Sequence, residues 1–360
     1  MERKTEIDIL KAFAITGVIL IHVTSNSFAL YPIKTAAWYC FVILDQAMRF
    51  SVPLFVALSG YTIALRYLEK NIKIKNFYLR RLTRILPYYL AATAIIYLYL
   101  RLIPPWSRNE ITYPLWQIIL MGKADYHLYF IPMILQLYLI FPFIIKAFKK
   151  WPQATIGTAF VVQVLIFVMT DLSVKKFITL PFTWGDQQQY LIALTWIFYF
   201  VLGMGLANLS RFSAKNLNLT KTFAVLLAVG GLTLTISESF RTLAAHQDLI
   251  EATRFTRFPV MIFSSGVILS CTLFAKYLLR IPKLAVRFLA KVGLISFSIY
   301  LLHTIAIRMV ILNIDVYPIS NFFIFAAASL IASFILAWIF EEILKVIKKS
   351  AQALLSDKDL

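Results

Sequence analysis

The sequence has 360 residues, of which 60% are hydrophobic and 15% aromatic, with 36 lysines and arginines against 17 acidic residues. Such an apolar fraction excludes a soluble enzyme of this length and predicts a polytopic membrane protein. The net charge of +19 does not indicate a nucleic-acid partner, because the basic residues gather in short gaps between apolar runs of about 20 residues, where they act as topology signals.

Ten apolar runs predict an all-α fold with about ten transmembrane helices. The predicted spans are 8–28, 38–65, 84–102, 127–147, 155–170, 190–208, 222–237, 258–279, 294–311 and 321–344. The gaps on one side hold 24 basic residues and those on the other side hold 10, so the positive-inside rule predicts that both termini are cytoplasmic. We expect one transmembrane domain at 1–348 and a short cytoplasmic tail at 349–360, in the plasma membrane.

The first predicted span carries three ionisable residues, Asp8, Lys11 and His22. At about 100° per residue, Lys11 and His22 lie within roughly 20° of each other and Asp8 within roughly 60° of both, so all three share one stripe. Ser25 and Asn26 continue this stripe by one turn. Charges at membrane depth cost about 2.5–3.5 kcal/mol each and face a protein interior or a wet cavity. The stripe is therefore a candidate functional site.

The second predicted span contains Asp45 and Arg49 in the i, i+4 spacing, with the acid first. This order favours an ion pair within one helix. The pair lies at about the depth predicted for His22 in the outer half of the bilayer. Two interpretations stay open: a structural bridge, or a group that binds the acceptor of a reaction.

The third predicted span begins beside five basic residues, Lys73, Lys75, Arg80, Arg81 and Arg84. The two lysines are typical of topology signals and of contact with anionic lipid. Arg81 and Arg84 differ, because the i, i+3 spacing places them on one helix face and guanidinium groups bind phosphate through two parallel hydrogen bonds. We expect them to bind a phosphate, either of a nucleotide or of a lipid headgroup.

Three further residues are candidates with two interpretations each. His127 begins the fourth predicted span, where it either lies at the membrane interface or binds an acceptor. His303 lies nine residues into its span and either supports the site or packs in the core. Glu238, at the outer end of the seventh span, either orients a histidine or a sugar hydroxyl or is a helix-end charge. Cys40 and Cys271 lie in apolar runs, so neither a disulfide nor a metal site is expected.

Several motifs follow one another in a recognisable order. Lys11 and His22 are separated by ten residues. The later motifs are "SVPLFVALSGY" at 51–61, "RRLTRILP" at 80–87, "YHLYFIPMILQLYLIFP" at 126–142 and "SFSIYLLH" at 296–303. Together they resemble the acyltransferase-3 family of integral membrane O-acyltransferases. Lysine replaces the more common arginine at Lys11, and Tyr129 stands where the family usually has tryptophan.

The resemblance covers most of the chain and implies transfer of an acyl group, commonly acetyl from cytoplasmic acetyl-CoA, to a hydroxyl. The acceptor would be a cell-surface glycan, a lipid-linked sugar or an exported small molecule. Many members also carry an extracytoplasmic esterase-like domain, for which we expect no room in this chain. Besides these substrates, membrane lipids are the expected partners.

Roles follow for the candidate residues. We expect His22 to be the general base, with an acyl-histidine intermediate or a packed core histidine as alternatives, and His303 to be the second catalytic candidate. Lys11, with Arg81 and Arg84, is expected to contact the donor, although Lys11 and Asp8 are equally placed to form a helix-fixing ion pair. The expected acceptor-binding or supporting residues are Asp8, Ser25, Asn26, Asp45, Arg49, His127 and Glu238.

Two other classes of function fit ten spans with internal charges. One is a secondary transporter or a flippase for a polysaccharide or lipid-linked sugar. Such proteins commonly have two related halves, but the Lys11/His22 and Arg81/Arg84 features have no counterpart in residues 180–360. The other is a membrane scaffold within a polysaccharide synthase, which would leave the stripe on the first span unexplained.

Overall fold

A computed structural model describes residues 4–30, 35–103, 113–174, 177, 188–208, 217–246, 249–313 and 321–356. Helices and their connections account for these residues, and none of them lies in a β-strand. Eight helical segments are long and apolar enough to cross a membrane, or nine if a bent pair of helices counts as one more span. The prediction of an all-α polytopic membrane protein is confirmed.

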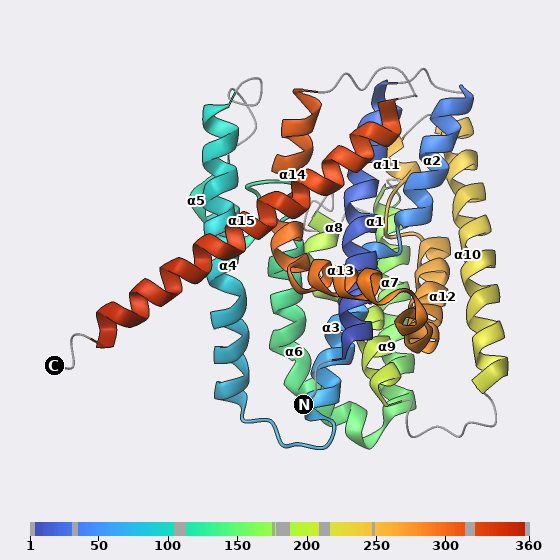
Figure 1. Ribbon diagram of the computed structural model, residues 1–360. Helices are drawn as coiled ribbons and strands as arrows, with labels where there is room; N and C mark the ends of the chain where they lie inside the picture. The colour runs from blue at the N-terminus through green and yellow to red at the C-terminus, as the bar shows by residue number, and fades with distance from the viewer. Residues whose placement is uncertain are drawn as a thin grey trace. The chain divides into compact units, whose positions relative to one another are not determined.

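In chain order, and with two 3₁₀ segments labelled η, the helices are α1 (Thr5–Leu30), α2 (Ala36–Met48), α3 (Ser51–Tyr67), α4 (Ile74–Leu102), α5 (Leu115–Leu120), α6 (Phe130–Lys150), α7 (Pro152–Val174), α8 (Gln188–Leu191), η2 (Ala193–Trp196), α9 (Ile197–Ala207), α10 (Leu217–His246), α11 (Leu249–Ala252), α12 (Phe258–Phe274), η5 (Ala275–Arg280), α13 (Lys283–Leu294), α14 (Ser296–Ile311) and α15 (Phe322–Ser356). Figure 1 shows their course along the chain.

The chain divides into two compact units. We call Met1–Leu44 together with Leu278–Leu360 the terminal unit, and Asp45–Tyr277 the central unit. The division falls inside α2 and inside η5, so helical boundaries and unit boundaries do not coincide.

The terminal unit is built around α1, which packs against α13, α14 and α15, while α14 packs along α15. Gly293, near the end of α13, allows the closest approach. A Cβ atom there would lie 1.7 Å from the backbone oxygen of Asp8, so any side chain would force α13 away from α1. The backbone of α15 runs on to Ser356, so the predicted tail at 349–360 begins as a continuation of this helix.

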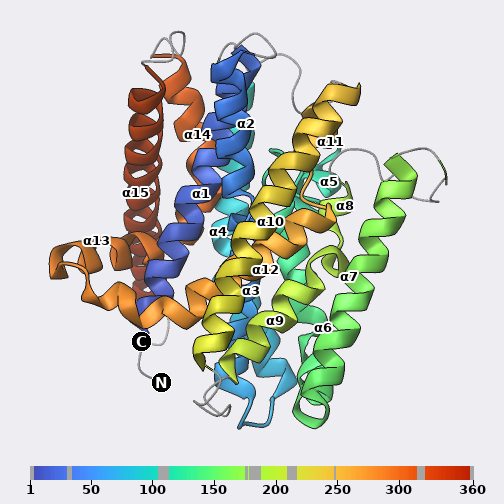
Figure 2. The same cartoon turned by 90° about the vertical axis from the view of Figure 1, so that its right-hand side faces the viewer.

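The central unit is built from two tightly packed helix pairs, α3 with α9 and α10 with α12. Figure 2 shows α10 and α12 side by side. The contact between α3 and α9 depends on Gly203, where a Cβ atom would lie 1.9 Å from the backbone oxygen of Ala57. Close backbone approach at small residues is common in membrane helices, because lipid provides no hydrophobic driving force for their association.

Three predicted spans differ from the structure. The span predicted at 190–208 contains η2 and the short helix α9 in place of a full-length helix. The span predicted at 294–311 is α14, which bends by 78° from α13, a segment for which the sequence predicts a basic gap. The helix expected to begin at residue 84 begins at Ile74, because the basic residues there continue the helix instead of ending it.

Candidate functional site

Two histidines from distant parts of the sequence meet inside the terminal unit. His22 lies on α1 and His303 on α14. Their ring centroids are 5.1 Å apart, and the rings are inclined by 33°. The packing of α14 against α1 brings them together, so the two predicted catalytic candidates lie side by side.

The two rings have different surroundings. The side chain of His303 is fully buried, whereas His22 remains partly accessible. The Nδ1 atom of His303 lies 2.7 Å from the backbone oxygen of Tyr300. Because a carbonyl oxygen can only accept, Nδ1 donates, and the neutral imidazole then has its lone pair on Nε2. The main chain of α14 therefore selects the tautomer of His303.

The rest of the predicted stripe follows α1. Lys11 forms an ion pair with Asp8 at 3.1 Å, which is the helix-fixing arrangement left open by the sequence. Asn26 donates to the backbone oxygen of His22 at 2.7 Å, and the side chain of Ser25 is partly accessible. Asn26 thus supports the last turns of α1 and does not bind the imidazole of His22 through this bond.

A polar contact that the sequence reasoning missed also lies in the terminal unit. Ser298 on α14 donates to Glu341 on α15 at 2.5 Å. A carboxylate near the C-terminal end of the last predicted span, 321–344, was the available signal, because an acid within a membrane span requires a partner. Ser298 lies on the same helix as His303, so this bond helps to hold α14 against α15.

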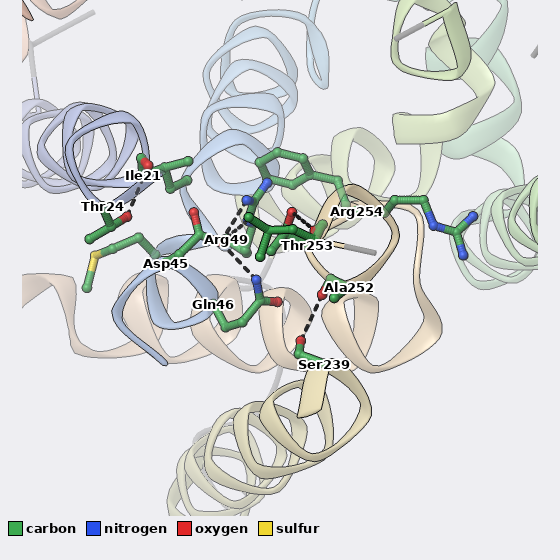
Figure 3. Close-up of polar contacts among 12 residues, drawn as sticks. Ile21, Thr24, Asp45, Gln46, Arg49, Ser239, Ala252, Thr253 and Arg254 are labelled. Carbon is green, nitrogen blue, oxygen red and sulfur yellow. Dashed lines mark hydrogen bonds and ion pairs between the residues drawn. The ribbon is translucent and has the colours of Figure 1, made fainter. Parts of the chain in front are cut away.

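The central unit contains a network of buried polar side chains. Arg49 donates from Nε and Nη2 to Asp45 at 2.8 and 2.7 Å, as the i, i+4 spacing predicts. Gln46 donates to the same carboxylate oxygen at 2.8 Å and accepts a hydrogen bond from Arg257. Figure 3 shows Gln46 beside Asp45 and Arg49 at the end of α2. One carboxylate oxygen of Asp45, Oδ2, therefore accepts hydrogen bonds from both Arg49 and Gln46.

Arg257 links this network to α10. It donates to Ser239 at 3.0 Å and forms an ion pair with Glu238 at 3.2 Å. Burial lowers the pKa of Arg257 to about 10, which the carboxylate of Glu238 partly opposes, so the group stays charged at neutral pH. Glu238 therefore binds an arginine and not a histidine through this contact. Two arginines just before an apolar run, Arg254 and Arg257, were the signal for this end of the network.

One cation–π contact and one ion pair lie beside the network. The guanidinium carbon of Arg49 lies 4.6 Å from the centre of the Phe255 ring, within the range of a cation–π interaction. Arg254 pairs with Asp171 at 3.1 Å, and Figure 3 shows its side chain extending away from Asp45 and Arg49. Among the described residues, the buried Nε and Nη1 atoms of Arg254 have no hydrogen-bond partner, so the polar groups at this end of the network are only partly satisfied.

The predicted phosphate-binding arginines lie on α4 in the central unit. The guanidinium of Arg81 lies 5.3 Å from the centre of the Tyr138 ring and 5.7 Å from that of Phe77. Arg84, one turn later, is exposed. Within the described ranges, neither arginine pairs with a carboxylate. Both guanidinium groups thus keep donors that suit a phosphate.

His127 lies in the turn before α6, also in the central unit. Its Nδ1 atom lies 3.6 Å from a carboxylate oxygen of Asp125, and both side chains are buried. The chain before this turn folds back at Gly122, whose φ of 70° suits glycine. His127 is therefore beside an acid that the sequence reasoning did not single out.

Comparison with known proteins gives one family. The family model described as "Acyltransferase domain" matches residues 4–341. No curated protein and no solved structure matches the chain.

Proposed function

We propose that this protein transfers an acetyl group from cytoplasmic acetyl-CoA to a hydroxyl group. The chain belongs to the acyltransferase domain family and is a membrane acyltransferase, and the proposal proceeds from that membership. The acceptor in this proposal is a cell-surface glycan, a lipid-linked sugar or an exported small molecule, and the membrane is the plasma membrane. One observation supports the chemistry most directly: the ring centroids of His22 and His303 lie 5.1 Å apart in the terminal unit.

His22 is the general base in this proposal. An alcohol is a weak nucleophile toward a thioester, and imidazole is the side chain that keeps a neutral, basic form near neutral pH. His22 is partly accessible, so a hydroxyl can approach it, whereas His303 is fully buried. The accessible ring is therefore the one that contacts the substrate.

Proton transfer and acyl transfer are coupled in the proposed step. His22 takes the proton of the acceptor hydroxyl while the hydroxyl oxygen forms a bond to the thioester carbonyl carbon. The carbon–sulfur bond then breaks, and the proton passes from His22 to the sulfur, so CoA leaves as a thiol. His303 acts as a positioning residue, because its Nδ1 donates to Tyr300 and its Nε2 lone pair is suited to accept from a neighbouring imidazole.

The donor contacts are proposed separately. Arg81 and Arg84 are suited to the phosphates of CoA because their guanidinium groups have no carboxylate partner in the described part of the central unit. Lys11 is already paired with Asp8, so its contribution to the donor would be shared with that ion pair.

The test uses purified protein in lipid nanodiscs with acetyl-CoA carrying a radiolabelled acetyl group. We expect release of CoA thiol and transfer of label to a hydroxyl acceptor, with loss of both in His22→Gln. Butyryl-CoA and palmitoyl-CoA, assayed in parallel, define the acyl length. Label transfer from a longer acyl-CoA alone would refute the acetyl assignment, and the absence of thioester turnover with any acyl-CoA would refute acyl-CoA as the donor.

A further inference from the structure

Helix α13 in the terminal unit carries a row of cations that the proposed reaction does not use. Lys283, Arg287 and Lys291 are spaced i, i+4 and i+8 over its 12 residues, and all three side chains are exposed. At about 100° per residue they cover roughly 80° of the helix circumference. None of them takes part in an ion pair with another described residue. They form a continuous basic stripe.

A second stripe on α13 is apolar and exposed. Leu284 is 80% exposed and Phe288 is 55% exposed. These two residues are spaced i, i+4 and lie directly beside the basic stripe on the helix circumference. Large apolar side chains with this much exposure, next to a row of cations, are typical of a helix that lies in a membrane interface.

The orientation of α13 agrees with such a position. It bends by 78° from α14, and Figure 2 shows it running crosswise to α14 and α15, which lie along each other. Its C-terminal end, which adjoins α14, is held against α1 by the contact of Gly293 with the backbone of Asp8. Asp8 lies near the end of α1 for which the distribution of basic residues predicts a cytoplasmic position.

We propose that α13 is an interfacial helix that binds the headgroups of anionic phospholipids in the cytoplasmic leaflet through Lys283, Arg287 and Lys291. Leu284 and Phe288 enter the acyl-chain boundary in this arrangement. Charge complementarity favours this occupant, because a cytoplasmic leaflet containing anionic lipid attracts each nearby lysine or arginine. A plain topology signal needs neither a helical row of cations nor an exposed apolar row beside it.

Lipid binding is tested by native mass spectrometry of the purified protein with added phosphatidylglycerol or phosphatidylcholine. We compare Arg287→Gln/Lys291→Gln with a control of equal charge, Lys146→Gln/Lys150→Gln, whose exposed lysines lie in the last turns of α6. Loss of each stripe cation is expected to weaken phosphatidylglycerol binding by about fivefold. The control substitutions are expected to weaken phosphatidylglycerol binding by less. Equal binding in the two variants, or displacement of the lipid by acetyl-CoA, would overturn the proposal.

The depth of the helix is tested by a nitroxide label at Phe288→Cys, with Cys40 and Cys271 replaced by serine. In nanodiscs that contain phosphatidylglycerol, we expect the label to be accessible to oxygen and shielded from a water-soluble nickel chelate. Access of the chelate would place α13 in water, and shielding from both reagents would indicate a covering protein. Either result contradicts an interfacial helix, whether or not acyl transfer is observed.

Discussion

The histidine pair of the terminal unit and the arginine network of the central unit both place polar groups inside helical packing, but they are built differently. In the network, Arg49 pairs with Asp45 and Arg257 pairs with Glu238, so each of these cations has a carboxylate. In the pair, two imidazoles lie side by side, and one of them remains partly accessible. Opposite charges held together fix a structure, whereas two neighbouring bases are suited to move a proton.

The largest effect is expected at the accessible imidazole. His22→Gln should reduce acyl transfer by about 10²- to 10⁴-fold, because the variant lacks the general base. Donor affinity and the thermal unfolding midpoint should change little. The measurement is label transfer from acetyl-CoA, with calorimetry for binding. Transfer near the wild-type rate would make His303 the leading candidate for the base.

A buried carboxylate in the network should matter for stability more than for chemistry. Asp45→Ala leaves the buried guanidinium of Arg49 without its carboxylate, which should lower the free energy of unfolding by about 3–5 kcal/mol. Thermal unfolding in one detergent measures the change. The double variant Asp45→Leu/Arg49→Met should recover most of the loss, because no buried charge then lacks a partner. A stable single variant would show that the pair is not structural.

Donor affinity should depend on the exposed arginine of α4. Arg84→Ala should weaken acetyl-CoA binding by about ten- to a hundredfold, which corresponds to roughly 1.5–3 kcal/mol for a charge-assisted hydrogen bond. Arg84→Lys should restore only part of the lost affinity for acetyl-CoA, because an ammonium group cannot bind a phosphate through two parallel hydrogen bonds. Lys75→Ala, on the same helix, is the control for loss of charge. Unchanged binding in Arg84→Ala, measured by calorimetry, would restrict the arginine to topology or lipid contact.

The smallest effect is expected at the accessible edge of the network. The side chain of Glu238 is 41% exposed, and Arg257 keeps its bonds to Ser239 and Gln46 without it. Glu238→Gln should therefore change the free energy of unfolding by about 0–1 kcal/mol. Thermal unfolding of Glu238→Gln and of Asp45→Ala, measured under the same conditions, compares the loss of stability in the two variants. A loss as large as that of Asp45→Ala would show that exposure does not separate these two ion pairs.

Local spacing made several features predictable. Apolar runs indicated the membrane helices, and the helical period placed Asp8, Lys11 and His22 on one stripe of α1. The i, i+4 rule predicted the ion pair of Asp45 and Arg49. Each of these depends on residues within one helix, whose relative positions follow from the rise and rotation per residue.

Contacts between helices were not predictable in the same way. The hydrogen bond from Arg257 to Gln46 joins residues 211 positions apart, and helical periodicity says nothing about which helices pack together. For the same reason the sequence proposed His303 as a candidate without indicating that it meets His22.

Helix α13 marks the clearest limit of the sequence reasoning. Its 12 residues are too short to span a bilayer, and its three cations made it resemble a gap between spans. The 78° bend and the close contact of Gly293 with Asp8 arise only when α1, α13 and α14 pack together. The sequence by itself determined which segments are apolar helices and which faces carry charge, because both follow from local periodicity. Tertiary packing alone decided which of those faces meet, because steric fit between helices depends on residues far apart in the chain.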